Sequence, residues 1–122
     1  MAQGATTGED LMGTNYYLKR ECDHDMIMRK FALPDVLEVH IGKQSNGWQF
    51  VFHGYKGVVE TRSMWEDTIH DAIRLGWNIV DDYGSRFTFR SFFNIVDASK
   101  GKKMQGDFVS NDGWSFIHGD FS

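Results

Sequence analysis

The dipeptide Asn46-Gly47 constrains the fold of this chain more than any other short feature, because it is the pair best suited to the positive φ angles of a tight type I′ turn. Apolar and polar residues alternate on both sides of it, over residues 36–43 and 48–52. Such alternation is typical of strands that are buried on one face. The sequence therefore predicts a β-hairpin near the centre of the chain.

The turn also predicts a register for this hairpin. A turn centred between its two residues pairs Ile41 with Phe52, which places the apolar faces of both strands on the same side of the sheet. The same register places His40 directly opposite His53 on the polar face, with Cβ atoms roughly 4.5–5.5 Å apart. That spacing suits two ligands of one metal ion.

Other patterns predict a strand before this hairpin and a helix after it. The strand is expected over residues 15–20. The Ser63-x-x-Glu66 pattern is typical of a capping box and predicts that the helix begins there, with Gly76 as its stop. Helical spacing predicts a buried stripe of Trp65, Ile69, Ala72 and Ile73.

The C-terminal half predicts two short strands, a second helix and a closing hairpin. Residues 77–87 are expected to form two short strands around a turn in which Asp81 and Asp82 bind their own backbone, rather than acting as a catalytic pair. Thr88 is expected to cap a helix that ends at Gly101. Its apolar stripe is Phe89, Phe92, Phe93 and Val96. The pair Asp112-Gly113 predicts a closing hairpin.

Together these elements predict an α+β fold, a small antiparallel sheet of two hairpins plus an N-terminal strand, with two helices packed on one face. A chain of 122 residues with 41% hydrophobic residues can bury one core. We therefore expect residues 12–122 to form a single domain. The polar residues 1–11 have no apolar anchors and are expected to be a flexible tail.

Charge and composition narrow the classes of partner and the compartment. The formal net charge of −4 argues against nucleic acid as a partner. No apolar run approaches the roughly 20 residues of a membrane span, and residues 1–11 lack the pattern of a secretory signal. The single cysteine, Cys22, excludes an internal disulfide. We therefore expect a cytoplasmic protein without a membrane partner.

Three stretches carry a resemblance to a known family: MGTNYYL at residues 12–18, HIGKQSNGWQF at residues 40–50 and DDYGSRFT at residues 81–88. They resemble small uncharacterised proteins of bacteriophages and bacteria, and the likeness runs from Met12 to the C-terminus. No established activity comes with this family. The resemblance implies a phage-type accessory protein in the cytoplasm of a bacterial host.

The resemblance also implies a zinc site, because many members carry a Cys-x-x-Cys pair between the first two motifs. Here Cys22 remains, and Asp25 stands at the second cysteine position. The ligand set that follows is Cys22, Asp25, His40 and His53, which are all residue types that bind zinc. A carboxylate in place of a thiolate weakens a soft-ligand site, so the favoured interpretation is a degenerate site without tightly bound zinc.

We expect the protein to act by binding, since the sequence has no phosphate-binding glycine-rich loop and no nucleophile elbow. The first hypothesis is that it binds, and inhibits, a host protein such as a defence or metabolic enzyme. The second is a small nucleotide-like ligand held around His40, Lys43, Trp48 and His53. The third is a metal-dependent enzyme. A large exposed apolar patch would favour a protein partner, whereas a deep pocket with converging polar groups would favour a ligand.

Overall fold

The computed structural model describes residues 13–21 and 36–119. The predicted tail, residues 1–11, lies outside this range, as do Cys22 and Asp25. The strands are β1 (Thr14–Glu21), β2 (Val36–Gln44), β3 (Val51–His53), β4 (Asn78–Asp81), β5 (Arg86–Phe87), β6 (Phe108–Val109) and β7 (Ser115–Ile117). The helices are α3 (Arg62–Arg74) and α4 (Phe89–Ala98).

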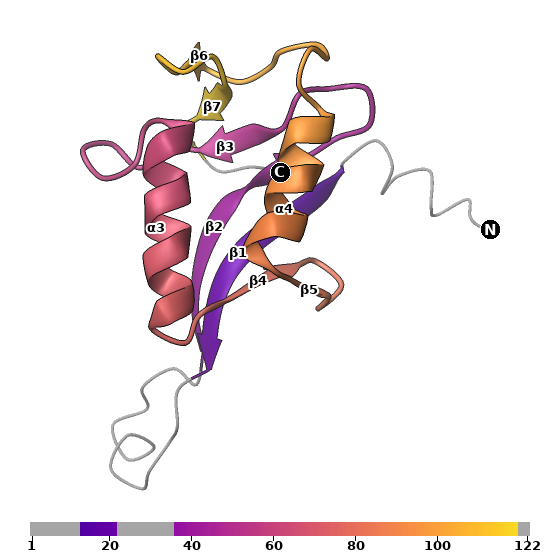
Figure 1. Cartoon of the computed structure of the whole chain (residues 1–122). Helices are drawn as coiled ribbons and strands as arrows, with labels where there is room; N and C mark the ends of the chain where they lie inside the picture. The colour runs from indigo at the N-terminus through magenta and orange to yellow at the C-terminus, as the bar shows by residue number, and fades with distance from the viewer. Residues whose placement is uncertain (1–12, 22–35, 120–122) are drawn as a thin grey trace, which may run out of the picture.

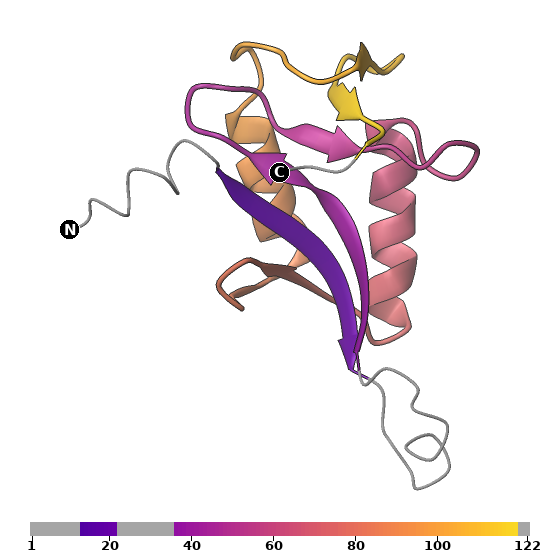
Figure 2. The ribbon, with the colours of Figure 1, turned by 180° about the vertical axis from the view of Figure 1, so that it is seen from behind.

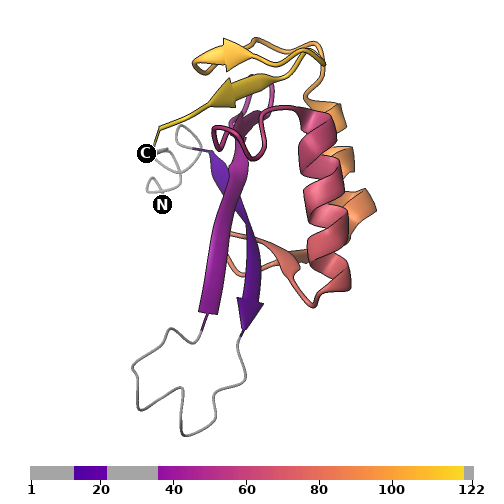
Figure 3. The ribbon, with the colours of Figure 1, turned by 90° about the vertical axis from the view of Figure 1, so that its left-hand side faces the viewer.

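All seven strands form one sheet in the order β5-β4-β1-β2-β3-β7-β6 (Figure 1). Neighbouring strands are antiparallel except β3 and β7, which are parallel. Figures 2 and 3 show α3 and α4 side by side on one face of this sheet. In the described part of the chain no helix covers the opposite face, which we call the helix-free face. The predicted α+β fold is confirmed.

The core lies between the sheet and the two helices and is mostly aromatic. Its fully buried large side chains include Trp65, Phe50, Phe52, Phe92 and Phe116. Phe52 of β3 stacks on Phe116 of β7, with ring centroids 5.3 Å apart. The parallel β3–β7 pairing, which the sequence did not predict, thus joins the C-terminal hairpin to the core.

Helix α3 begins before the predicted capping box. Its N-cap is Thr61, whose hydroxyl accepts a hydrogen bond of 3.1 Å from the Met64 amide. The Glu66 carboxylate does not close a box with Ser63 and instead accepts a hydrogen bond of 2.9 Å from Arg62. The prediction of a cap at Ser63 was therefore wrong by two residues.

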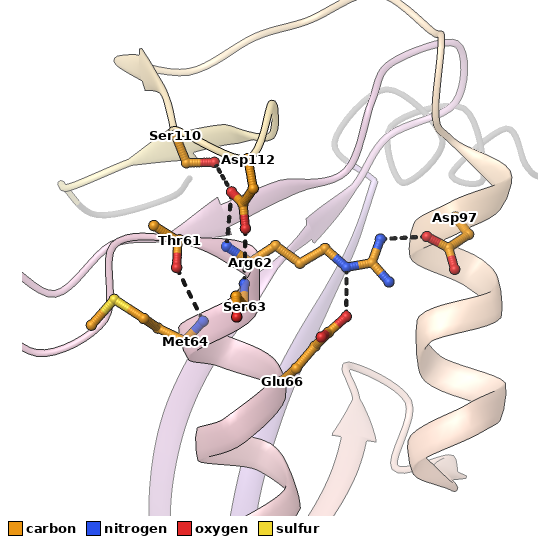
Figure 4. Close-up of polar contacts among 8 residues, drawn as sticks. All are labelled: Thr61, Arg62, Ser63, Met64, Glu66, Asp97, Ser110 and Asp112. Carbon is orange, nitrogen blue, oxygen red and sulfur yellow. Dashed lines mark hydrogen bonds and ion pairs between the residues drawn. The ribbon is translucent and has the colours of Figure 1, made fainter.

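A tertiary contact explains the difference (Figure 4). The Asp112 carboxylate, in the turn between β6 and β7, accepts hydrogen bonds from the backbone amides of Arg62 (3.3 Å) and Ser63 (2.9 Å). It also accepts one from the Ser110 hydroxyl. The first amides of α3 are thus bound by a carboxylate that is distant in sequence, which also suits the positive end of the helix dipole.

The Arg62 side chain ties the same helix end to α4 and the C-terminal hairpin (Figure 4). Its guanidinium pairs with Glu66 and Asp97. It also lies 5.0 Å from the ring centroid of Phe93 and 4.8 Å from that of Trp114. Charge pairing and cation–π contact therefore fix how α3 sits against its neighbours.

The end of α3 follows the prediction. Gly76 has φ +93°, and the amide of Trp77 donates to the carbonyl of Ala72 at 3.0 Å, as in a Schellman motif. The predicted stripe is confirmed except at Ile73, whose side chain is 37% exposed. Trp65, Ile69 and Ala72 are the buried residues of α3, on the side of the helix that faces the sheet. Ile73 is rotated about 100° from Ala72 on the helix surface and points away.

The other predicted elements are confirmed except for the end of the second helix, which ends at Ala98 and not at Gly101. Thr88 caps α4 in a capping box with Ser91. Three side chains of the apolar stripe are buried, namely Phe92, Phe93 and Val96. Strands β4 and β5 flank the expected turn. The Asp112-Gly113 turn joins β6 to β7, with Gly113 at φ +85°.

The central hairpin turns at the predicted residues, but its strands pair in a different register. The Trp48 amide donates to the Ser45 carbonyl at 3.1 Å, and Gly47 has φ +85°. However, Gly42 pairs with Phe52, where the prediction placed Ile41. The predicted register was therefore wrong by one residue.

The shift arises between the turn and β3. Ser45 follows Lys43 by two residues, whereas Val51 follows Trp48 by three. Trp48 and Gln49 pair there with Lys103.

A separate β-bulge lies in β2, beyond Gly42. Across the β1–β2 pair, Tyr16 is opposite Gly42 and Tyr17 is opposite His40, which leaves Ile41 as an extra residue with a fully buried side chain. Alternation therefore changes phase at Ile41. Because the bulge is set by pairing with β1, the local pattern of the hairpin could not predict it.

Candidate functional site

The two histidines meet as predicted, although not as directly paired residues. Their ring centroids are 5.3 Å apart with an interplanar angle of 71°. The β2–β3 pairing ends at Gly42 and Phe52, so His40 and His53 touch across the end of the ladder. His40 is on the helix-free face, because its partner Tyr17 lies between core residues and successive strand residues point to opposite faces.

His40 belongs to a hydrogen-bonded network with β1 and the turn after β4. Its Nε2 lies 3.0 Å from Oδ1 of Asn15, whose own amide donates to the Asp82 carboxylate at 3.2 Å. The Tyr17 hydroxyl donates to the same carboxylate at 3.3 Å. Asp82 therefore binds β1. The prediction that its side chain binds the backbone of its own turn was wrong. The corresponding prediction is confirmed for Asp81, whose Oδ1 accepts from two turn amides.

Burial and the neighbouring ring of His53 lower the pKa of His40 to about 4. A backbone hydrogen bond with Gly42 and the charge of Asp82 act in the opposite direction and are weaker. The ring is therefore neutral at pH 7. Burial, together with Asp82, raises the pKa of Tyr17 to about 12, so its phenol stays protonated.

The histidine pair has few further ligands for a metal. Within residues 13–21 and 36–119, no three His, Cys, Asp or Glu side chains are grouped closely enough to hold an ion. Cys22 and Asp25 of the predicted zinc set lie outside the described residues. A metal bound to His40 would also have to displace a hydrogen bond with Asn15 or Gly42.

The other two predicted binding residues differ in where they lie. Lys43 lies on β2 opposite Asn15 and Val51, and its charge helps to lower the pKa of His40. Trp48 forms a β-bridge with Lys103, whose ammonium is 4.9 Å from the centroid of the indole. A nucleotide base would have to displace this ammonium to stack on that face of the ring.

A cavity of about 540 Å³ lies between α3 and the strands β1 and β2. Its lining, which defines the apolar cleft, is Leu18, Val39, Tyr55, Val58, Val59, Trp65, Thr68, Asp71, Ala72, Leu75 and Trp77. Val58 and Leu75 are 69% and 67% exposed. The cleft therefore has exposed apolar residues from both the 55–59 loop and the end of α3.

Few polar atoms face this cleft. The Tyr55 hydroxyl donates to the His40 carbonyl at 3.0 Å, and the Trp65 indole donates to the His53 carbonyl at 2.9 Å. Their hydrogen-bonding groups are thus bound to the strands that carry the histidines, and their rings are left for apolar contact. Thr68 and Asp71 supply the other polar groups of the lining.

Sequence reasoning missed this cleft for identifiable reasons. Leu75 and Trp77 flank the helix stop at Gly76, outside the periodic stripe of α3. Val58 lies in a loop closed by a hydrogen bond of 2.9 Å from the Tyr55 amide to the Val59 carbonyl. The sequence did contain one indication of the cleft: Val58, Leu75 and Trp77 are apolar although they lie outside the apolar stripes of the predicted helices and strands.

No protein-family model, curated protein or solved structure matches this chain. The fold and the cleft define its class as an α+β protein with an apolar groove beside a helix. No helix of the described residues is long and apolar enough to cross a membrane.

Proposed function

We propose that this protein acts by binding another protein through the apolar cleft. The observation that carries the proposal is a cavity of about 540 Å³ with an almost wholly apolar lining and a rim of exposed Val58 and Leu75. Exposed apolar surface of this kind is costly in water and is typical of a surface that a partner covers. This was the feature expected to favour a protein partner over a small ligand.

The partner would insert several apolar side chains from one helix or extended segment. Tyr55, Trp65 and Trp77 would supply broad rings for these side chains, since aromatic residues dominate the energy of protein interfaces. Each large apolar side chain that becomes fully buried contributes about 1.5–3 kcal/mol. A few such anchors suffice for a specific complex.

The resemblance to phage and bacterial proteins supports a bacterial host protein as the partner, with inhibition of a defence or metabolic enzyme as the consequence. A nucleotide-like ligand has less support, because Trp48 packs with Lys103 instead of facing the histidines. A metal-dependent enzyme also has less support, since His40 already has hydrogen-bond partners in the network with Asn15.

Capture from bacterial extract with matched variants tests the proposal. Leu75→Glu and Val58→Glu place a charge at the cleft, whereas Val109→Glu places the same charge at a 53% exposed apolar residue of β6, away from the cleft. We expect both cleft variants to retain at least tenfold less of a partner that the wild-type protein and Val109→Glu retain equally. Tenfold corresponds to about 1.4 kcal/mol.

Melting curves of the three variants should agree, since all three side chains are exposed. If Leu75→Glu and Val58→Glu bind every captured protein as well as the wild-type chain does, the cleft is not the binding surface. If all three variants lose the partner equally, the loss is nonspecific and the proposal also fails.

A further inference from the structure

We infer that the helix-free face carries a binding site for a single oxyanion group, a phosphate or a carboxylate, between β1, β4 and β5. This site is separate from the apolar cleft and does not depend on the proposed function. A pocket of about 170 Å³ lies there, and its lining, which defines the oxyanion pocket, is Lys19, Asn78, Val80, Gly84 and Arg86. Its size suits one small polar group and is too small for a protein segment.

The strand register brings the polar side chains of this pocket together. Lys19 of β1 is directly opposite Asn78 of β4, and Arg86 of β5 is directly opposite Val80 of β4. Asn78 and Val80 are two residues apart, so their side chains share a face. An ammonium, a carboxamide and a guanidinium therefore surround Val80 on three adjacent strands.

None of the residues 13–21 and 36–119 that line this pocket carries a carboxylate. Glu38 pairs with Lys19 at 3.6 Å, but both side chains are nearly half exposed and this pair is weak. The nearby acidic residues Asp81 and Asp82 are bound to turn amides and to β1, respectively. Among the residues that the structure describes, Arg86 has no ion-pair partner.

The donors fit an oxyanion by chemistry as well as charge. A guanidinium presents parallel N–H donors that match two oxygens of a phosphate or carboxylate, and an ammonium adds a compact positive charge. The Asn78 amide supplies a neutral donor between them. The charged residues of the pocket lining are Arg86 and Lys19, so the lining itself is positive in a chain of formal net charge −4.

Titration of the full-length ¹⁵N-labelled protein by NMR tests the inference, with inorganic phosphate and acetate as separate probes. We expect saturable shifts of the Asn78 side-chain amide and the Arg86 Nε–H signal with at least one probe. Sodium chloride at matched ionic strength should not reproduce them. Tighter binding of phosphate would assign the site to phosphoryl groups, and tighter binding of acetate would assign it to carboxylates.

Variants connect such shifts to the pocket. Arg86→Gln and Lys19→Gln should each weaken binding at least tenfold, and Arg86→Lys should weaken it less, because it keeps the charge and loses the paired donors. Lys56→Gln, an exposed lysine in the 55–59 loop, is the matched control and should bind as the wild-type protein does. Shifts that chloride reproduces, or an affinity that Arg86→Gln leaves unchanged, would overturn the inference.

Discussion

The neutral imidazole of His40 makes the stability of this protein depend on pH. Its pKa is about 4 in the folded protein and 6.5 for the unperturbed side chain, so between these values the unfolded chain binds more protons than the folded one. The free energy of unfolding should therefore be highest above about pH 6.5 and fall as the pH drops toward 4. Solvent screening of a half-buried ring limits the His40 share to about 1–2 kcal/mol.

Denaturant unfolding of the wild-type protein and of His40→Gln at several pH values measures this share. The variant should lose stability less steeply between pH 6.5 and pH 4, and the difference between the two curves isolates His40 from the other titrating groups. Parallel curves for the two proteins would show that His40 does not titrate as described.

The backbone of β2 at Gly42 lies close to Val51 and Phe50. A Cβ atom there would lie 2.4 Å from the Val51 carbonyl oxygen and 2.5 Å from the Phe50 ring. Gly42→Ala should therefore lower the free energy of unfolding by about 1–3 kcal/mol, since backbone and a buried ring must move. Gly119→Ala is the control, because no atom lies within 4 Å of its added Cβ. Equal melting temperatures for the two variants would refute this account of the close packing at Gly42.

At the scale of elements, the two candidate caps of α3 give a direct comparison. Thr61→Ala removes the hydroxyl that binds the Met64 amide and should cost about 1 kcal/mol of stability. Ser63→Ala should change stability by a few tenths of a kcal/mol at most, because the Asp112 carboxylate binds the Ser63 backbone amide and not its side chain. Thermal unfolding measures both, and a larger loss for Ser63→Ala would restore the capping box predicted from the sequence.

Elements with strong local signals could be predicted from the sequence. Thr88 and Gly76 mark helix ends through their own backbone chemistry, and Asp112-Gly113 marks a turn in the same way. The register of the central hairpin could not be predicted, since it depends on the distant pairing of Trp48 and Gln49 with Lys103. The start of α3 likewise depends on Asp112, which is about fifty residues away in sequence.

For the candidate sites too, features set by local sequence could be predicted and features set by distant contacts could not. The contact between His40 and His53 could be predicted, because both lie on the polar face of one hairpin. The apolar cleft could not, since it combines a loop, a helix end and two strands. The oxyanion pocket needs the order β5-β4-β1, which no local pattern contains.

At the scale of the whole molecule, the sheet separates two surfaces of different chemistry. The apolar cleft lies on the side of α3, and the oxyanion pocket lies on the helix-free face. A change at Leu75 should therefore leave phosphate or acetate titrations unaltered, and a change at Arg86 should leave apolar contacts at the cleft intact.

The central claim is that a partner protein covers the apolar cleft. Photo-crosslinking tests it most directly: a benzophenone amino acid replaces Leu75 in one protein and Val109 in another, and each is irradiated in bacterial extract. We predict a discrete adduct from position 75 that excess unlabelled wild-type protein suppresses, and no such adduct from position 109. Adducts from position 109 alone, or adducts from position 75 that the wild-type protein does not suppress, would contradict the account.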